Sequence, residues 1–233
     1  MLKIIGISGK KQSGKNTAAN YISGDVLRSQ GMISDYILND KGSLQIKTLD
    51  HNGDVGWGEF DMLRKDSEFC SYAENAIWPH VKIYHFADYL KKICVDLFDL
   101  TPDQVYGTDI DKNSATNYNM TAREFLQYFG TDVMRKIKDS IWVDYTIKKI
   151  KEEESSVALI PDVRFPNEVA KIKEAGGVVI RLDRNVFDSD HHCETSLDEN
   201  TYNWSNFDYI IKNNDGNVSD LCKDLQQLSP LWR

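Results

Sequence analysis

The chain has 233 residues, of which 41% are hydrophobic and 27% are charged, and its formal net charge is −8. This is the composition of an ordinary soluble globular protein, long enough for one large α/β domain or two small ones. No stretch approaches the roughly 18 consecutive apolar residues that a membrane span requires. Because a nucleic-acid binder needs a basic face, the excess of acidic residues argues against one. We therefore expect neither a membrane nor a nucleic acid as a partner.

The four cysteines lie far apart, at Cys70, Cys94, Cys193 and Cys222, and form no C-x-x-C pair. This spacing argues against a zinc site and against a disulfide framework, and it fits a reducing compartment. The first residues enter a predicted strand at once, which leaves no room for a signal peptide. We expect a cytoplasmic location.

The first predicted element is a strand that runs into a glycine-containing loop. The apolar run from Ile4 to Ile7 is typical of a buried parallel strand. Gly9, Gly14 and Lys15 then follow the G-x-x-x-x-G-K spacing of a phosphate-binding loop. Glycines let successive backbone N–H groups point at one anion, and the next helix adds its positive N-terminus. The alternative is an ordinary strand-to-helix turn.

The lysine of this loop and the two residues after it are candidates for binding the phosphates and a Mg²⁺ ion. Lys15 would supply a mobile cation to the terminal phosphates of a nucleoside triphosphate. Asn16 stands where a serine or threonine usually holds Mg²⁺. Thr17 follows one residue later and can take that role, as in the Gly-Lys-Gly-Thr loops of nucleotide monophosphate kinases.

An insertion is predicted after the first helix. That helix runs from Thr17 to about Ser29, and its apolar residues recur at helical spacing. Turn clusters then bracket Leu44–Leu49, which partly alternates like a strand. We predict an inserted segment at about 31–80 that bears a hairpin and lies outside the core sheet. Within it, we predict that Gly56–Gly58 is a loop anchored by Trp57.

The middle of the chain is predicted to be mainly helical. The second core strand is Val81–Ala87, and Asp88 caps the helix that follows. Thr101–Asp103 starts a short helical turn, and Asp109–Asn119 is a flexible loop. A later helix covers Asp139 to about Glu153.

Between them lies a helix with a capping box, formed by Thr121 and by Glu124 three residues later. Arg123, Gln127 and Gly130 follow one another at spacings of four and three. They are therefore predicted to share one face of this helix.

The last third of the chain alternates strands with helices. Val157–Pro161 is an apolar strand that ends in Asp162, where a P-loop fold places a second carboxylate directed at Mg²⁺. Arg164 follows two residues later. Further strands at Val178–Leu182 and Tyr209–Ile211 complete a mostly parallel sheet with helices on both faces. We predict one α/β domain over residues 1–233.

One short segment contains the residue types of a metal site. His191, His192, Cys193 and Glu194 are consecutive, but adjacent ligands on one segment rarely close a tetrahedral site. We predict that His191 and Glu194 order a loop instead.

Several of these phrases together resemble the deoxynucleoside monophosphate kinases of tailed bacteriophages. The resemblance covers most of the chain except about 29–80, and it rests on the order and spacing of the phrases. The matching phrases are Gly9–Thr17, Phe86–Lys91, Arg123–Asp132, Trp142, Pro161–Arg164 with Glu168, His191 with Glu194, and Asn213–Gly216.

This resemblance implies a P-loop kinase that moves the γ-phosphoryl group of ATP to a deoxynucleoside 5′-monophosphate with Mg²⁺. It further implies a homodimer, and, if the protein is encoded by a phage, a location in the cytoplasm of the bacterial host. The ATP phosphates would lie at Gly14, Lys15, Asn16 and Thr17. The acceptor nucleotide would lie at Lys11, Lys91, Arg123, Gln127, Gly130, Trp142, Asp162, Arg164 and Glu168. Thr17 and Asp162 would serve the metal, and the residues expected to carry the transfer are Lys15, Arg123, Asp162 and Arg164.

Other interpretations stay open. Arg123 can be a surface residue of its helix, Asp162 and Arg164 can form a structural ion pair, and Trp142 can belong to the core. The chain can also be another small-molecule P-loop kinase, similar to dephospho-coenzyme A kinase, or a nucleotide-binding module without a transfer reaction. Basic residues beyond the loop favour a kinase, because a module of that kind needs no second phosphate site.

Overall fold

The computed structural model describes residues 2–49, 52–184, 195–213 and 215–233. The chain forms two compact units. The first, called the core unit below, comprises Met1–Tyr84 and Lys149–Arg233, and the second, called the helical unit, comprises His85–Lys148. That residues 1–233 act as one kinase domain stays a prediction.

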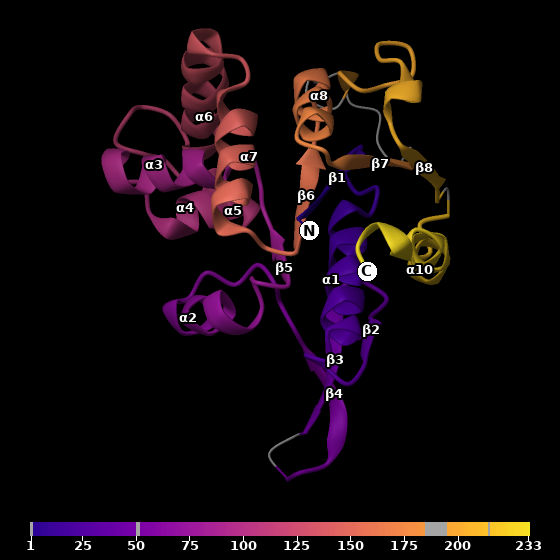
Figure 1. Ribbon diagram of the computed structural model, residues 1–233. Coiled ribbons are helices and arrows are strands. Elements are labelled where there is room, and N and C mark those ends of the chain that lie inside the picture. Colours follow the sequence, from indigo (N-terminus) through magenta and orange to yellow (C-terminus); the bar gives the residue numbers. More distant parts are fainter. Residues whose placement is uncertain (1, 50–51, 185–194, 214) are drawn as a thin grey trace. The chain divides into compact units, whose positions relative to one another are not determined.

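A five-stranded parallel sheet forms the centre of the core unit (Figure 1). Its spatial order is β5-β6-β1-β7-β8, so the first strand of the chain lies in the middle. The predicted parallel α/β architecture is confirmed. The strands are β1 (Lys3–Gly9), β5 (Val81–Ile83), β6 (Val157–Val163), β7 (Val178–Asp183) and β8 (Tyr209–Lys212).

Helices cover both faces of this sheet, as predicted. Ile5 and Ile7 point to one face and join the buried cluster that includes Ile22 of α1 (Lys15–Ser29). Gly6 points to the other face, where a Cβ atom would lie only 2.8 Å from Cδ1 of Ile172 on α8 (Pro166–Glu174). Strand β1 therefore packs tightly between two helices, and side chains alternate between them.

Parallel pairing brings the carboxyl ends of three strands to one edge. Ser8 of β1 pairs with Arg181 of β7 on one side and with Val163 of β6 on the other. Between Gly6 and Ser8 the register with β6 shifts, because β6 contributes one residue more than β1. This bulge contains Asp162, which lies beside the end of β1. The strand was predicted to end in Asp162, and it continues for one more residue, to Val163.

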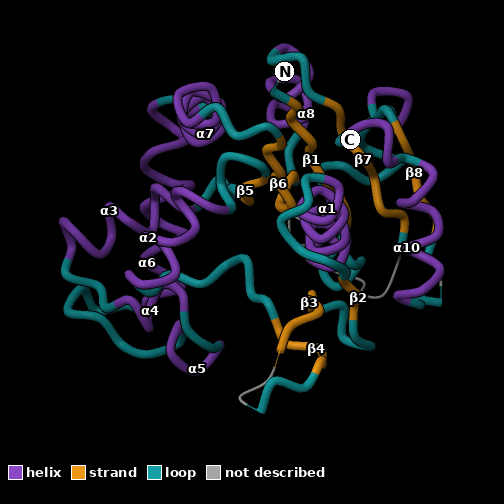
Figure 2. Tube along the Cα trace, turned by 60° about the horizontal axis from the view of Figure 1, so that its bottom comes forward, coloured by secondary structure: helices purple, strands orange, loops and turns teal. Residues whose placement is uncertain are grey.

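The inserted segment forms a separate antiparallel sheet, which confirms the predicted hairpin (Figure 2). Its strands are β2 (Tyr36–Leu38), β3 (Leu44–Leu49) and β4 (Val55–Glu59). The predicted loop at 56–58 is wrong, because Trp57 pairs with Lys47 in the ladder of β3 and β4. Helix α2 (Ser67–Ala76), which the sequence analysis did not predict, follows and is capped by the side chain of Asp66.

The insertion packs directly on α1. A Cβ atom at Gly24 would collide with the ring of Tyr36, and one at Gly42 would collide with the side chain of Thr17. The amide of Asn20 also donates a hydrogen bond to the carbonyl oxygen of Gly42, at 2.9 Å. The turn between β2 and β3 is thus fixed to the first turns of α1.

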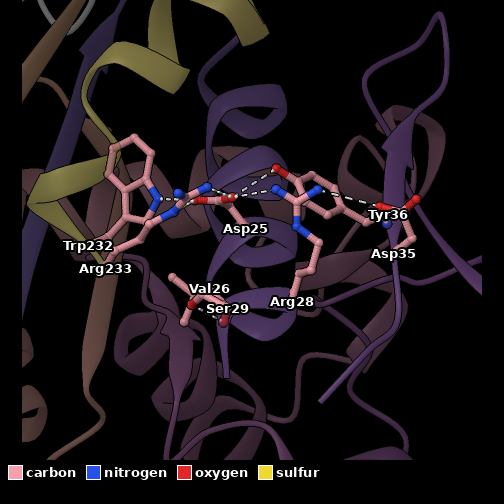
Figure 3. A network of polar contacts seen from close by, with 8 residues as sticks. All are labelled: Asp25, Val26, Arg28, Ser29, Asp35, Tyr36, Trp232 and Arg233. Carbon is pink, nitrogen blue, oxygen red and sulfur yellow. Dashed lines mark hydrogen bonds and ion pairs between the residues drawn. The ribbon is translucent and has the colours of Figure 1, made fainter. Parts of the chain in front are cut away.

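Asp25 joins α1 to the last residues of the chain, which follow α10 (Val218–Gln227) and a 3₁₀ turn at Ser229–Leu231 (Figure 3). Its carboxylate is fully buried and accepts hydrogen bonds from Trp232 Nε1 at 2.9 Å and from Arg233 Nη2 at 2.7 Å. Arg28 Nη2 lies 3.3 Å away. Burial alone would raise the pKa of Asp25, but the hydrogen bonds from Arg233 and Trp232 outweigh it and hold the pKa below its ordinary value.

The helical unit contains short helices. They are α3 (Asp88–Phe98), α4 (Pro102–Tyr106), α5 (Asp109–Lys112), α6 (Ala122–Gln127), a π-helix (Tyr128–Arg135) and the first part of α7 (Ile141–Glu153). The predicted capping box of Thr121 and Glu124 is confirmed. Within the described residues of the whole chain, no helix is both long and apolar enough to cross a lipid bilayer.

Three boundary predictions for this part of the chain are corrected. The strand predicted to reach Ala87 ends at Ile83. Asp88 belongs to the first turn of α3 and accepts a hydrogen bond from the backbone N–H of His85, at 3.1 Å. The predicted loop after residue 109 begins with α5, because Thr108 and Asp111 form a capping box there.

The buried carboxylate of Asp25 predicts a pH-dependent stability. Asp25→Asn removes the charge that Arg233 and Arg28 pair with, and should lower the free energy of unfolding at pH 7 by about 3 kcal/mol. Because the folded pKa is depressed, the contribution of Asp25 is present above its unfolded pKa of about 3.9 and is lost as the pH falls through the folded value. Urea denaturation between pH 7 and 2 should show the difference between wild type and variant shrinking below about pH 4.

Asp35→Asn is the matched control. Asp35 also pairs with Arg28, at 3.5 Å, but its side chain is 47% exposed. Its loss should be no more than about 1 kcal/mol. Equal losses for the two variants would contradict the assigned role of Asp25.

The contact between the insertion and α1 predicts a second difference. Gly42 and Gly53 both have positive φ angles, of 77° and 85°, but only the space beside Gly42 is occupied. Gly53→Ala should cost about 1 kcal/mol, the strain of a left-handed alanine. Gly42→Ala should cost about 3 kcal/mol, because Thr17 must also move. Thermal unfolding of both variants measures the difference, and indistinguishable melting temperatures would refute the contact.

Candidate phosphate-binding site

The loop between β1 and α1 has the backbone conformation that its glycines permit. Gly14, at the N-cap of α1, has a φ of 98°, and Gln12 has a φ of 62°. A Cβ atom at Gly9 would collide with the hydroxyl group of Ser13. These positions let the chain curl tightly in front of the helix N-terminus, as a backbone cradle for an anion requires.

Lys15 folds back across this loop. Its Nζ donates hydrogen bonds to the carbonyl oxygens of Gly9 and Lys10, both at 2.6 Å. Among the described residues, the fully buried hydroxyl of Ser13 has no hydrogen-bond partner. A buried hydroxyl normally has a partner, and a phosphate oxygen in the loop can provide one. The loop therefore fits a phosphate group.

Arg181 places a fixed positive charge beside the start of the loop. Its Nη1 donates a hydrogen bond to Ser8 Oγ at 3.0 Å, and its side chain is buried. The guanidinium carbon lies 5.1 Å from the ring centre of Trp204. Asp198 contacts both Arg181, at 3.7 Å, and Lys10, at 3.2 Å. The contacts of Arg181 with Ser8, Asp198 and Trp204 were not predicted from the sequence. A single arginine inside the apolar run of β7 was a signal for them.

Arg184 connects the loop to the turn before α10. It follows β7, and its Nη1 donates a hydrogen bond to the carbonyl oxygen of Gln12, at 3.1 Å. A Cβ atom at Gly216, which has a φ of 68°, would collide with this guanidinium group. Because Gly216 has no side chain, Arg184 can occupy the space beside it. A role for Arg184 was not predicted from the sequence.

The residues predicted to hold Mg²⁺ offer oxygen atoms, which this ion prefers. Asp162 lies in the β6 bulge beside the end of β1, and Thr17 lies in the first turn of α1 with its side chain against Gly42. Mg²⁺ usually binds one or two protein oxygens together with substrate phosphates. That Thr17 and Asp162 supply these oxygens stays a prediction. The described residues contain no cluster of three histidine, cysteine or acidic side chains that could hold a metal by itself. The cluster at 191–194 lies outside the described residues.

Glu168 fixes the turn that carries Arg164. Its carboxylate is buried and accepts hydrogen bonds from the backbone N–H groups of Arg164, at 2.7 Å, and Phe165, at 3.0 Å. Arg164 thus lies just beyond β6, near the same edge of the sheet as the loop. Lys11 and Asn16 are exposed in and directly after the loop. Nucleotide contacts by these residues stay predictions.

Five predicted acceptor residues belong to the helical unit. Arg123 is exposed on α6 and binds Asp109, with Nη2 to Oδ1 at 2.6 Å, and Asn113, with Nε to Oδ1 at 3.1 Å. Gln127, on the same helix, is also exposed. On α3, Nζ of Lys91 lies 4.9 Å from the ring centre of Tyr106.

Gly130 and Trp142 contact each other inside the helical unit. Trp142 is 5% exposed, and its Nε1 donates a hydrogen bond to the carbonyl oxygen of Gly130, at 2.9 Å. A Cβ atom at Gly130 would lie 2.6 Å from Leu90 Cδ2. The predicted common face with Arg123 and Gln127 is wrong for Gly130, because the wider turns of the π-helix move it inward. These contacts favour the core alternative for Trp142.

Two comparisons with known proteins identify the family of the chain. The sequence pattern of the deoxynucleotide monophosphate kinase family matches residues 3–225 of the chain. A protein of Acanthamoeba polyphaga mimivirus, described as a candidate deoxynucleotide monophosphate kinase, is 36% identical in an alignment of 148 residues that covers 55% of this chain and 73% of the relative. Neither match is specific to tailed bacteriophages, so that part of the resemblance stays a prediction. The chain therefore belongs to the deoxynucleotide monophosphate kinase family, whose name denotes nucleotide kinases.

Proposed function

We propose that this protein transfers the γ-phosphoryl group of ATP to deoxynucleoside 5′-monophosphates and releases ADP and deoxynucleoside diphosphates. The observation that carries the proposal is the glycine loop at the carboxyl edge of the sheet, with Lys15 folded over it and the family match across it. A cytoplasmic homodimer that binds neither nucleic acid nor membranes belongs to the same proposal.

Phosphoryl transfer needs mainly positioning and neutralisation of oxygen atoms. Lys15 would exchange the carbonyl oxygens of Gly9 and Lys10 for phosphate oxygens, and the hydroxyl of Ser13 would donate a hydrogen bond to a phosphate oxygen. The acceptor phosphate is itself the nucleophile and already carries charge, so the chain needs no strong general base. Thr17 and Asp162 would hold Mg²⁺, which when bound neutralises charge on the phosphates.

Two other functions would use the same loop. One is transfer to another small molecule, as in kinases similar to dephospho-coenzyme A kinase, and the other is nucleotide binding without transfer. An ADP-release assay with ATP against a panel of nucleoside monophosphates separates the three. Turnover with deoxynucleoside monophosphates supports the proposal, and nucleotide binding without any turnover contradicts it.

The first prediction concerns Lys15. Lys15→Ala removes charge stabilisation that is made mainly in the transition state, and turnover should fall by about 10²–10³-fold in a protein that stays folded. Lys47→Ala, which removes an exposed lysine of β3, should leave turnover unchanged. Near-normal turnover of the Lys15 variant would exclude a catalytic phosphate loop.

The second prediction concerns the acceptor phosphate. The planar fork of an arginine matches paired phosphate oxygens and lysine does not, so Arg164→Lys and Arg123→Lys should each cost about 1.5–3 kcal/mol. We therefore expect the KM for the deoxynucleoside monophosphate to rise roughly tenfold to a hundredfold. The KM for ATP should change little. Steady-state kinetics with each substrate varied in turn measures both constants, and a rise confined to ATP would move these arginines to the donor site.

A further inference from the structure

The core unit contains a cleft of about 620 Å³ between the insertion and the C-terminal helix. Tyr21 and Arg28 of α1 line it. Residues 36–40, from β2 and the turn after it, form one wall, and residues 216–219, before and within α10, contribute to the other. Its volume falls in the range of about 300–1,000 Å³ that is usual for small-molecule sites.

Both walls are attached to the phosphate loop and its helix. On the insertion side, Gly42 packs on Thr17 and accepts a hydrogen bond from Asn20, both in the first turns of α1. On the opposite side, Arg184 packs on Gly216 and donates a hydrogen bond to the carbonyl oxygen of Gln12 inside the loop. The cleft therefore runs along α1 beside Tyr21 and Arg28, and its two walls contact the loop and the first turns of α1, although no loop residue lines the cleft itself.

The sheet order separates this cleft from the predicted acceptor residues of the core unit. Asp162 and Arg164 belong to β6 and the turn after it, on one side of β1. The wall at 216–219 and the connecting Arg184 follow β8 and β7, on the other side of β1. A nucleotide whose phosphates occupy the loop can thus direct its nucleoside into the cleft and leave the β6 side to the acceptor.

The lining suits a nucleoside. Ile37, Leu38 and Val218 offer apolar contacts to a flat base. Asn217 and Ser219 belong to the same lining, which also contains Arg28, Asn39, Asp40 and Gln226. Polar side chains are therefore as common in the cleft as apolar ones, and a nucleoside, which joins a flat base to a sugar with hydroxyl groups, needs both kinds of contact.

We propose that this cleft binds the nucleoside part of the phosphoryl donor and that the insertion at about 31–80 supplies one of its walls. The proposal rests on the proposed kinase function and assigns a task to the segment that the phage kinase resemblance does not cover. The insertion would then help to decide which nucleoside triphosphate serves as the donor.

A bulky residue in the insertion wall tests this. Ile37 lines the cleft and is 40% exposed, so Ile37→Trp should narrow the cleft without disturbing the core. Leu49→Trp is the matched control, because Leu49 is 63% exposed on the same small sheet and does not line the cleft. The KM for ATP should rise roughly tenfold or more in the Ile37 variant alone, with the KM for the deoxynucleoside monophosphate unchanged in both.

Ser219→Trp and Lys223→Trp repeat the comparison on the opposite wall. Ser219 lines the cleft, whereas Lys223, one helical turn later, is exposed and does not. The variant at 219 should raise the KM for ATP and the variant at 223 should not.

Inorganic tripolyphosphate separates the cleft from the loop, because it carries the phosphates without a nucleoside. Its inhibition constant against ATP should be the same in wild type, Ile37→Trp and Ser219→Trp. If these variants leave the KM for ATP unchanged, or weaken tripolyphosphate as much as ATP, the cleft is not the nucleoside site although the kinase function stands. If neither ATP nor tripolyphosphate binds the wild-type protein, the kinase function itself fails, and this proposal with it.

Discussion

Strand β1 is paired on both edges and buried on both faces, and the position of the site depends on this constraint. Gly6 faces Ile172 so closely that a side chain would not fit, which fixes the distance between β1 and α8. The register with the two neighbouring strands then decides what lies beside the end of β1. Asp162 comes from β6 and Arg181 from β7. The surroundings of the phosphate loop are therefore determined by strand pairing as much as by the loop itself.

Lys10, Lys15 and Arg181, which surround the loop, already form contacts with other groups of the protein. Lys15 donates hydrogen bonds to two carbonyl oxygens of the loop, and Lys10 forms an ion pair with Asp198, which also contacts the buried Arg181. In a chain with a net charge of −8, these contacts hold the cations in place. A phosphate would exchange with the partners of Lys15 and Lys10, so the net gain per contact is smaller than the full charge interaction suggests.

The parts of the fold that the sequence predicted correctly depend on signals a few residues long. The G-x-x-x-x-G-K loop, the capping box of Thr121 and Glu124, and the apolar strand runs are of this kind. The predictions that failed concern residues whose conformation depends on partners far away in the sequence or on a change of helix type. Gly130 turns inward because a π-helix changes the helical period, and Trp57 joins a strand because Lys47 is there to pair with it. Asp198 could not be assigned to Arg181, since only the folded chain brings the segment after β7 back to this strand.

Helix α1 transmits these long-range constraints to the loop. Lys15 begins this helix and Asp25 lies ten residues later, about 15 Å along a rigid axis. The insertion holds α1 at Thr17 and Gly24, and the C-terminal residues hold it at Asp25. A buried carboxylate adds little net stability, because its desolvation offsets much of the charge interaction, and an apolar side chain of similar size often stabilises a protein as well. The hydrogen bonds of Asp25 with Trp232 and Arg233 are directional, so they fix the rotation of α1 about its axis. They thereby also fix the direction of the backbone N–H groups at the N-terminus of α1, which follows the phosphate loop directly.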